Sequence, residues 1–585
     1  MNCTNCQREI PDNIKFCPHC GQPVQIKKTK GKAKKVILAL VLSFVILASF
    51  IGYRIYSSHN EEEKPSIEYK YLNGITYCTD GVIYVDPDIT DDSDPYVLGT
   101  EDEELVDECS FIYLSTFSPD TSTIFYIADM EEKKTEVCGS LYSVKTEDIT
   151  SDADETRKRS TLIAKDVSGY YVPSGRDNGV LYQNVDEELY FYSDYGNEYL
   201  MDIDGISDVN CIYNYGSSHI LLTLKEGKEK SSTSMYIGSG YDVYHYDSAT
   251  QKLSIIDDDA SIPVGKYNKL VYTKNINNKT NSIDMCMSEI TDDGIKTTKI
   301  DEDVNNIDET YFTDDITHIT YTKKGEHYED DYTYDLFTYD NGTITELGEI
   351  DLARTTTEYV TFFNYFEPDD EKKNDTQYYT TGTSEVFESP FTKVLNAQVA
   401  IDEGKILIQA LNEDSVSCVY LCDVAYGKEI SNIQMVAYNA CVSGSYSTNY
   451  LFYAAGEKTR NLYISGDGTY KLMMHSVPSQ TYVYVKTTPV MDDNAYFFLV
   501  NMLDYDTSSS IYDIYIRDND KYLSRVETMV ENIMITGKGA VYTKDKALYY
   551  YSAETNEVEK IADSTYYYEV GNKYETSISL STYIY

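Results

Sequence analysis

Four cysteines at the start of the chain have the spacing of a tetrahedral zinc site. Cys3 and Cys6 form one Cys-x2-Cys pair, and Cys17 and Cys20 form a second. Each short pair supplies two thiolates, and four thiolates complete the shell that Zn²⁺ prefers in structural sites. A segment of about 24 residues buries too little apolar surface to fold alone, so the metal would supply the folding energy. We therefore predict structural zinc at Cys3, Cys6, Cys17 and Cys20.

Two other uses of the same cysteines have to be weighed. A pair of disulfides needs an oxidising compartment, and the topology argued below places these residues in the reducing cytoplasm. A redox-active Cys-x2-Cys pair normally lies within a βαβ unit, which the surrounding residues do not predict. His19 lies inside the second pair and competes as a ligand, but four thiolates already fill the shell. Zinc is the favoured interpretation.

Residues 1–24 as a whole resemble the short zinc-ribbon domains found at the N-termini of bacterial membrane proteins. The resemblance rests on the four cysteines, on Ile10-Pro11-Asp12 between the pairs, and on the run KFCPHCG at residues 15–21. The chain departs from that family at Gln7, where a glycine is usual. The resemblance implies a closed site in which protein fills every coordination position, so metal-based catalysis is not expected.

Residues 36–56, VILALVLSFVILASFIGYRIY, predict one transmembrane helix. They carry no charge before Arg54 and as a helix would span about 30 Å, the thickness of the hydrocarbon core. Lysines crowd residues 27–35 on one side, and three glutamates follow at 61–63 on the other. The positive-inside rule therefore predicts residues 1–35 in the cytoplasm and 57–585 outside. A cleaved signal peptide is the alternative, but a metal module upstream of the apolar run argues against it.

The charge of the chain divides along the same boundary. The net charge of −48 consists of +6 in residues 1–35, +1 from Arg54, and −55 from residue 57 onward. A surface this acidic repels nucleic acid, so nucleic acid is not an expected partner. The predicted organisation is a zinc ribbon (1–24), a basic linker (25–35), a transmembrane helix (36–56), an acidic stalk (57–66) and a large extracytoplasmic domain (67–585).

The outer domain reads as all-β. Runs rich in Tyr, Ile, Val, Phe and Thr alternate with clusters of Asp, Asn and Gly, and the chain holds 60 Tyr and no Trp. An apolar residue followed by an aromatic one and then a polar turn recurs at Leu141-Tyr142, Leu189-Tyr190, Val243-Tyr244, Leu336-Phe337, Val419-Tyr420, Leu462-Tyr463, Ile514-Tyr515 and Leu548-Tyr549.

The spacing of these dipeptides indicates a repeat of roughly 40–50 residues with several strands in each unit, which is typical of propeller blades. A weaker copy at Ile283–Met287 fills one double gap, whereas the long gap from Phe337 to Val419 indicates an insertion or a damaged blade. We expect a mostly β, propeller-like domain of about seven or eight irregular blades.

Two stretches also resemble the repeat of TolB-type propellers, in which a Ser-Pro-Asp-Gly turn launches a buried strand. The first is FSPDTSTIFY at residues 117–126, with Thr121 in place of the turn glycine. The second, FTDDITHITY at residues 312–321, is more degenerate. This resemblance implies the fold alone and brings no functional residues with it.

A string of β-sandwich modules is the alternative fold, with linkers and a period nearer 100 residues. The acidic stretch at 367–385 is the strong linker candidate. It reads either as a long loop between blades or as a split between two smaller domains. One propeller-like domain is favoured over both.

The outer domain carries no recognised catalytic signature. The GxSxG, HExxH and Walker-A patterns are missing, and the histidines are scattered. Acidic runs at 91–94, 257–259 and 329–331 offer oxygen ligands for calcium, but no EF-hand spacing accompanies them, so solvated loops are the simpler reading. The run SGDGTY at 465–470 predicts a hairpin turn. Eight outer cysteines permit disulfides without requiring them, and Cys418 and Cys422 lie too far apart along one strand to pair.

Three functions fit this organisation. The first is a non-enzymatic, membrane-anchored protein of the cell surface that binds an extracellular polymer, peptide or protein, with a neutral or cationic ligand favoured by the acidic surface. The second is a transmembrane sensor that couples outer binding to the zinc ribbon. The third is a propeller-type glycan or peptide hydrolase or lyase. The missing catalytic residues favour the first.

Overall fold

The computed structural model describes residues 73–580 of the chain, apart from gaps. These gaps are 92–93, 110–113, 135, 174–178, 194–195, 204–208, 216–218, 226–240, 248–249, 262, 267, 278–281, 292–293, 314, 329–331, 368–375, 401–403, 444–451, 456–458, 467–468, 479–482, 488–496, 506–509, 518–521 and 572–575. The described residues belong to one compact unit that begins at Tyr69. The predicted zinc ligands and the predicted membrane helix lie outside them.

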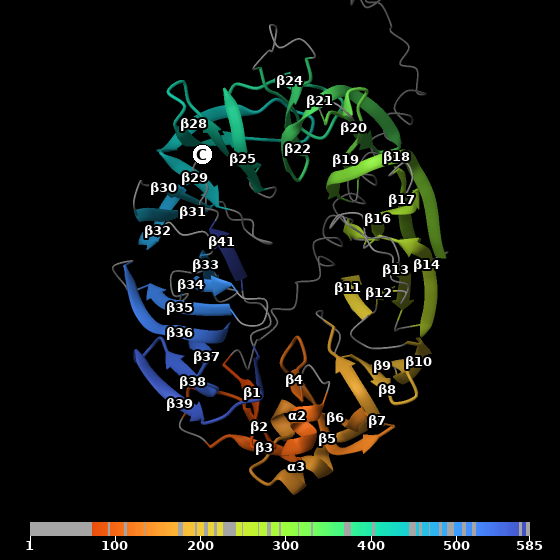
Figure 1. Cartoon of the computed structure of the whole chain (residues 1–585), viewed down its shortest axis with the longest axis vertical. Helices are drawn as coiled ribbons and strands as arrows, with labels where there is room; N and C mark the ends of the chain where they lie inside the picture. Colours follow the sequence, from red (N-terminus) through yellow and green to blue (C-terminus); the bar gives the residue numbers. More distant parts are fainter. Residues whose placement is uncertain are drawn as a thin grey trace, which may run out of the picture. The chain divides into compact units, whose positions relative to one another are not determined.

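The described unit is built almost entirely of antiparallel strands (Figure 1). The first sheet contains β40 (Tyr567–Val570), β1 (Ile75–Thr79), β2 (Val82–Asp86) and β3 (Tyr96–Thr100). The second contains β4 (Ser115–Phe117), β5 (Thr123–Lys133), β6 (Glu136–Lys145), β7 (Thr161–Tyr171), β8 (Val180–Asn184), β9 (Glu188–Ser193) and β10 (Gly196–Asp202).

The largest sheet has 14 strands. They are β11 (Val209–Tyr215), β12 (His219–Lys225), β13 (Tyr241–Asp247), β14 (Lys252–Ala260), β15 (Val264–Lys266), β16 (Lys269–Asn277), β17 (Ser282–Thr291), β18 (Gly294–Phe312), β19 (Thr317–Lys324), β20 (Tyr334–Asp340), β21 (Thr343–Thr357), β22 (Val360–Tyr365), β23 (Tyr378–Thr380) and β24 (Phe387–Glu388).

Three further sheets complete the described part of the unit. Two are four-stranded: β25 (Lys393–Ala400), β26 (Lys405–Leu411), β27 (Ser417–Asp423) and β28 (Ser431–Tyr438), then β29 (Ala440–Ser443), β30 (Phe452–Ala455), β31 (Thr459–Gly466) and β32 (Thr469–Pro478). The last contains β33 (Val483–Thr487), β34 (Phe497–Tyr505), β35 (Ser510–Arg517), β36 (Leu523–Ile535), β37 (Gly539–Lys544), β38 (Ala547–Ser552), β39 (Glu557–Ala562) and β41 (Thr576–Leu580).

Helices are few and short. Within the described ranges they are α2 (Glu103–Glu108), α3 (Ala153–Arg159) and a 3-10 turn at Thr146–Asp148. None of the helices in this part of the chain has the length and apolar character that a membrane crossing needs. The prediction of a mostly β unit is therefore confirmed.

Alternating side chains and tight turns explain why these residues form hairpins. Along β20 the side chains alternate between buried and half-exposed from Tyr334 to Thr338, as expected for a strand with one face in the core. Asn341 and Gly342 then adopt φ values of +46° and +96°, and Asp340 pairs directly with Thr343. Two left-handed residues in a two-residue loop match the twist of the flanking strands, which favours Asn-Gly at this position.

Long strands join successive four-stranded units. In β18, residues 294–304 pair with β17 and residues 304–312 pair with β19. In β21, residues 343–350 pair with β20 and residues 350–357 pair with β22. The same strand thus ends one unit and begins the next. Repetition of four-stranded antiparallel units along the chain is the pattern of a propeller, so the unit is propeller-like in its connectivity.

The repeated dipeptides occupy equivalent places in these units. All eight lie on the third strand, in β6, β9, β13, β20, β27, β31, β35 and β38, and the weaker copy at 283–287 lies on the third strand β17. The units outnumber the seven or eight expected blades for two reasons. The unit β40-β1-β2-β3 carries Ile83-Tyr84 on its third strand, a dipeptide outside the predicted series, and the long gap contains the complete unit β21-β22-β23-β24.

The candidate linker at 367–385 lies within one of these units. It begins after β22 and includes β23, and Thr361, Phe362 and Phe363 of β22 pair with Thr380, Tyr379 and Tyr378 of β23. The run at 465–470 joins β31 to β32, with Ser465 opposite Tyr470 and Gly466 opposite Thr469. It is therefore a hairpin, as predicted.

The first described strand pairs with one of the last two. β40 pairs with β1, with Tyr568 opposite Tyr77 and Val570 opposite Ile75, and β41 returns to pair with β33. The Tyr567 hydroxyl lies 2.7 Å from Ser115 Oγ and 3.0 Å from Thr76 Oγ1, so it ties β40 to β1 and to β4 of the next sheet. The C-terminal segment thus completes a sheet that begins at Ile75.

The two TolB-like turns connect the first and second strands of their units. Asp120 Oδ1 accepts hydrogen bonds from Ser118 Oγ (2.7 Å) and from the Ser122 main-chain N–H (3.0 Å), so the turn is internally bonded. Thr121 takes φ +60° and is fully buried. The family glycine suits this left-handed position, so the departure at Thr121 places a strained residue there.

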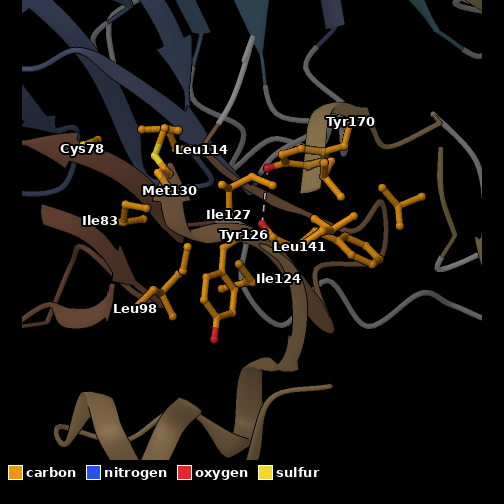
Figure 2. Packing of buried hydrophobic residues seen from close by; sticks show 14 of the residues in the cluster. Cys78, Ile83, Leu98, Leu114, Ile124, Tyr126, Ile127, Met130, Leu141 and Tyr170 are labelled. Atoms are coloured by element: carbon orange, nitrogen blue, oxygen red, sulfur yellow. Dashed lines mark hydrogen bonds between the residues drawn. The ribbon is translucent and has the colours of Figure 1, made fainter. Parts of the chain in front are cut away.

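Apolar residues from neighbouring sheets form shared cores. Figure 2 shows Ile83 and Leu98 of the first sheet beside Ile124, Ile127 and Leu141 of the second, all buried in one cluster. Such sheet-on-sheet packing explains why the strands are rich in Ile, Val, Leu and Tyr.

Candidate functional site

A histidine and a glutamate meet at the loop between β19 and β20. His327 Nδ1 lies 3.1 Å from Glu349 Oε2, and the main-chain N–H of His327 donates to Glu349 Oε1 at 2.9 Å. Thr333 Oγ1 also donates to Oε1, at 2.5 Å. Burial alone would raise the pKa of Glu349, but the hydrogen bonds from Thr333 and His327 outweigh it and lower that pKa. Glu349 is therefore an ionised acceptor at neutral pH.

A glycine makes room for this carboxylate. A Cβ at Gly325 would lie 2.5 Å from Glu349 Oε1 and 2.7 Å from Thr333 Oγ1, closer than van der Waals contact permits. The strand register brings the parts together, because Lys324 of β19 pairs with Tyr334 of β20. Glu349 in turn pairs with Asp335 across β20 and β21. Residues 22 positions apart in sequence thereby share one site.

Aromatic rings surround the pair. The His327 ring lies 5.0 Å from Phe366, and Tyr328 lies 5.9 Å from Tyr332 and 5.3 Å from Tyr334, centroid to centroid. Tyr332 is 62% exposed, and the side chains of His327 and Glu349 are 37% and 20% exposed. The exposed Tyr332 thus stands next in sequence to Thr333, whose hydroxyl donates to the anionic Glu349.

The electrostatic character of this site is anionic. Burial raises the pKa of Asp335, and the negative charges of Glu346, Glu349 and Glu326 raise it further. A cation already lies against one ring, since Lys324 Nζ is 4.4 Å from the Tyr328 centroid. Carboxylates and accessible tyrosine faces together attract organic cations and polar rings.

A second group of acids and tyrosines lies between two sheets. Tyr311 of β18, Tyr359 of the β21–β22 turn and Tyr426 after β27 contact one another with centroids 4.9 to 6.0 Å apart. Burial, then repulsion by Glu358, raises the pKa of neighbouring Glu309 to about 7. Two carboxyl groups in a half-buried setting compete for ionisation, so Glu309 holds its proton close to neutral pH.

We expect Glu309→Gln to stabilise the protein at pH 8 and to change little at pH 5. The raised pKa means that the folded chain binds this proton more tightly than the unfolded chain, so the stability it confers is present at low pH and is lost as pH rises through about 7. Glutamine is neutral throughout, and the expected gain at pH 8 is about 2 kcal/mol. Urea unfolding at both pH values measures it. Glu413→Gln, at an exposed turn residue, is the control, and an equal gain at both pH values would contradict the argument.

The residues singled out in the sequence have different outcomes. Cys3, Cys6, Cys17 and Cys20 lie outside the described residues, as does the acidic run at 329–331. His318 is fully buried, and burial lowers its pKa to about 4, so it is a neutral core residue. In the acidic run at 257–259, the Asp257 carboxylate accepts hydrogen bonds from Tyr272 and Lys274, so it has a structural role. The seven outer cysteines that the structure describes are free thiols.

The structure also reveals a motif that the sequence reading missed. The tripeptide Tyr-Thr-Lys occurs on the second strand of three units, and each lysine lies within 2.8 Å of an acid on the strand before it. The three sets are 272–274 with Asp257, 321–323 with Asp301, and 542–544 with Glu527. Because it recurs in separate units, the motif is structural, and a search for repeated tripeptides would have found it. His327 and Glu349 carried no comparable signal.

Comparison with known families identifies the N-terminal segment. Residues 2–24 match the model of the zinc-ribbon domain, and this range includes all four predicted ligands. The matched domain type suggests zinc binding. A comparison with curated proteins finds no match to the chain.

Solved structures similar to the chain include propellers and peptidases. The β-propeller domain of the trilobed protease from Pyrococcus furiosus is 11% identical with a TM-score of 0.29, and the match covers 55% of this chain and 96% of that one. TolB from Acinetobacter baumannii is 14% identical (TM-score 0.22; 52% and 78% covered). Dipeptidyl peptidase 4 from Porphyromonas gingivalis is 13% identical (TM-score 0.31; 75% and 64% covered). These TM-scores are low, and the propeller-like connectivity is shown by the strand pairing itself.

Proposed function

We propose that the chain is a single-pass membrane protein whose β-rich domain lies outside the cell and binds a neutral or cationic polymer, peptide or protein. Residues 1–24 would form a cytoplasmic ribbon held by zinc at Cys3, Cys6, Cys17 and Cys20, and residues 36–56 would cross the membrane. The zinc-ribbon match at residues 2–24 and the charge difference across 36–56 support this organisation. Bound zinc would supply folding stability to the ribbon.

The observation that carries the binding role is the half-exposed His327–Glu349 pair beside Tyr328 and Tyr332. Tyrosine rings offer large rigid faces at low entropic cost, and they are enriched where proteins recognise ligands. The ionised Glu349 adds a fixed acceptor for ligand hydroxyl or ammonium groups. The anionic surroundings oppose an acidic ligand, which leaves neutral and cationic ones.

Binding is favoured over hydrolysis by the direction of one hydrogen bond. In a nucleophilic triad the hydroxyl donates to the imidazole, which then accepts its proton. Here the neighbouring hydroxyl of Thr333 donates to the carboxylate of Glu349 instead. That geometry holds Glu349 in place and differs from the hydroxyl–imidazole pair of a nucleophilic triad.

The test is binding by the full chain, purified in detergent, to arrays of wall glycans and of neutral and basic peptides. We expect ligands enriched over a charge-matched acidic control protein. Tyr332→Ala should weaken binding of the best of these ligands about tenfold, which corresponds to a loss of about 1.4 kcal/mol of binding free energy. Tyr199→Ala, at a 50% exposed tyrosine of β10, is the matched control. No enrichment, or equal loss in both variants, would reject the proposal.

The membrane topology has its own test. Protease added to intact cells should digest the region after residue 57 and spare a tag placed before residue 1. Thiol labelling of the first twenty residues should require permeabilised cells. Finding both ends on one side of the membrane would overturn the proposed organisation, whatever the array shows.

A further inference from the structure

Lys324, the last residue of β19, lies against an aromatic ring instead of a carboxylate. Its Nζ is 4.4 Å from the ring centroid of Tyr328, which is within the range of a cation–π contact. Among the residues that the structure describes, it forms no ion pair with a carboxylate, although residues 57–585 carry a net charge of −55. The Tyr328 ring is therefore what holds this half-exposed ammonium group in place.

Other cations that lie over rings have a second partner. Within the described ranges each of them also pairs with a carboxylate, and the three sets are Arg157 over Tyr142 with Asp129, Lys323 over Phe337 with Asp301, and Arg354 over Tyr334 with Asp308. A cation–π contact alone contributes only about 0.5–1 kcal/mol at an exposed site. The ammonium group of Lys324 can therefore leave its ring at little cost.

We propose that the Tyr328 ring binds a lysine side chain of a peptide ligand, and that Lys324 occupies this ammonium site until the peptide displaces it. The inference rests on the proposed binding role of the same site. The group that the ring already holds is a lysyl ammonium, so the site accepts a cation of this size. An amino sugar carries its ammonium directly on a ring and lacks a flexible stem with which to reach a half-buried ring.

The ammonium site is held rigidly. Tyr328 meets Tyr332 and Tyr334 edge to face, with centroids 5.9 and 5.3 Å apart. The main chain of the loop is also bonded to itself, because the Tyr328 N–H donates to the Gly325 carbonyl at 3.2 Å and the Tyr332 N–H donates to the Tyr328 carbonyl at 3.0 Å. A ring whose orientation is fixed in advance loses little freedom when a ligand binds.

The charges around the ammonium site favour a cationic ligand over a neutral one. Glu326, Glu346 and Glu349 all repel the negative charge of Asp335, so four acidic groups lie close together on and beside β20 and β21. Lys324 pairs across the sheet with Tyr334, the residue before Asp335. An incoming ammonium experiences the same negative field that Lys324 does, whereas a neutral group gains nothing from this field when it displaces a cation.

Peptide binding by the full chain in detergent tests this inference. The probes are fluorescent, end-blocked Gly-Gly-Lys-Gly-Gly and the same peptide with acetyl-lysine, compared by anisotropy in physiological salt. The lysine peptide should bind about tenfold more tightly. Lys324→Met should tighten its binding about fivefold, the factor that about 1 kcal/mol gives. Lys324→Arg keeps a cation on the ring and should give no gain, and neither should Lys252→Met, which removes an exposed lysine of β14.

Two changes of the ring give an independent measurement. Tyr328→Phe keeps the aromatic face and should bind the lysine peptide like the unchanged chain. Tyr328→Leu removes the face and should abolish the gain from Lys324→Met, with the unfolding temperature measured for both variants. If the leucine variant does not fold, the comparison of Lys324→Met with Lys324→Arg decides.

Several results would overturn the inference. Equal tightening by Lys324→Met and Lys252→Met would mean that only net charge acts on the peptide. Equal binding of the lysine and acetyl-lysine peptides, or no binding of either by Lys324→Met, would exclude a lysine ligand. Tighter binding of glucosamine oligomers than of the lysine peptide would make the ligand an amino sugar. The proposed binding role survives each of these results if array ligands still depend on Tyr332, whereas an array that enriches nothing rejects both proposals.

Discussion

A chain that ends at Ser564 is expected not to fold into a stable unit. The deletion removes β40 and β41, so β1 and β33 each lose one of their two strand partners. Tyr568 and Val570 are 6% and 4% exposed, and they belong to the core cluster that also contains Ile75 and Leu548. Loss of each such side chain costs about 2–5 kcal/mol, which together approaches the whole stability of a typical domain.

Urea unfolding and limited proteolysis measure this effect. A chain that ends at Leu580 keeps both strands and should unfold like the complete protein. A finer comparison uses adjacent tyrosines: Tyr567→Phe removes the hydroxyl that joins Ser115 and Thr76 and should cost about 1–3 kcal/mol. Tyr566 is 43% exposed, so Tyr566→Phe should change stability little. A stable chain without residues 565–585 would show that the pairing of the terminal strands is dispensable.

Local patterns predicted the repeating unit well because they arise from local physics. On the third strand, one residue of each apolar-aromatic dipeptide packs into the core of its own unit. Because this pattern depends on the unit alone, Leu141-Tyr142 and Leu548-Tyr549 can be aligned from the sequence. The count failed where the local signal weakened. The third strand β23 has only three residues, Tyr378–Thr380, and it carries no apolar-aromatic dipeptide, so the sequence pattern shows a gap at its unit.

The candidate site could not be predicted in the same way. His327 lies in the loop between β19 and β20 and Glu349 lies on β21, so only the register of β19, β20 and β21 brings them within 3.1 Å. A lone histidine and a lone glutamate in an acidic chain carry no spacing signal. No sequence pattern marks Gly325 either, because its role is to leave space for the Glu349 carboxylate, which is distant in sequence. Tertiary register, which no local pattern encodes, decides such sites.

Arg354→Ala is expected to destabilise the domain by about 3–5 kcal/mol, because it leaves a buried charge without its partner. Arg354 Nε donates to Asp308 Oδ2 at 2.8 Å and Nη2 donates to Oδ1 at 2.5 Å. The side chains are only 13% and 4% exposed. The pair joins β21 to β18, which are not neighbours in the sheet, so it adds a contact between two strands that no main-chain pairing joins directly.

Two further variants separate charge from packing. Lys134→Ala removes an ion pair whose side chains are 62% and 63% exposed, and such exposed pairs contribute little to stability. The double variant Arg354→Met with Asp308→Leu removes both buried charges and should recover much of the lost stability, because apolar replacements of a buried pair are often neutral. Urea unfolding of the four proteins decides the matter. If Arg354→Ala loses no more stability than Lys134→Ala, water reaches the Asp308 carboxylate. If the double variant recovers no stability, Arg354 acts through its packing against Tyr334, whose ring centroid lies 5.5 Å from Arg354 Cζ.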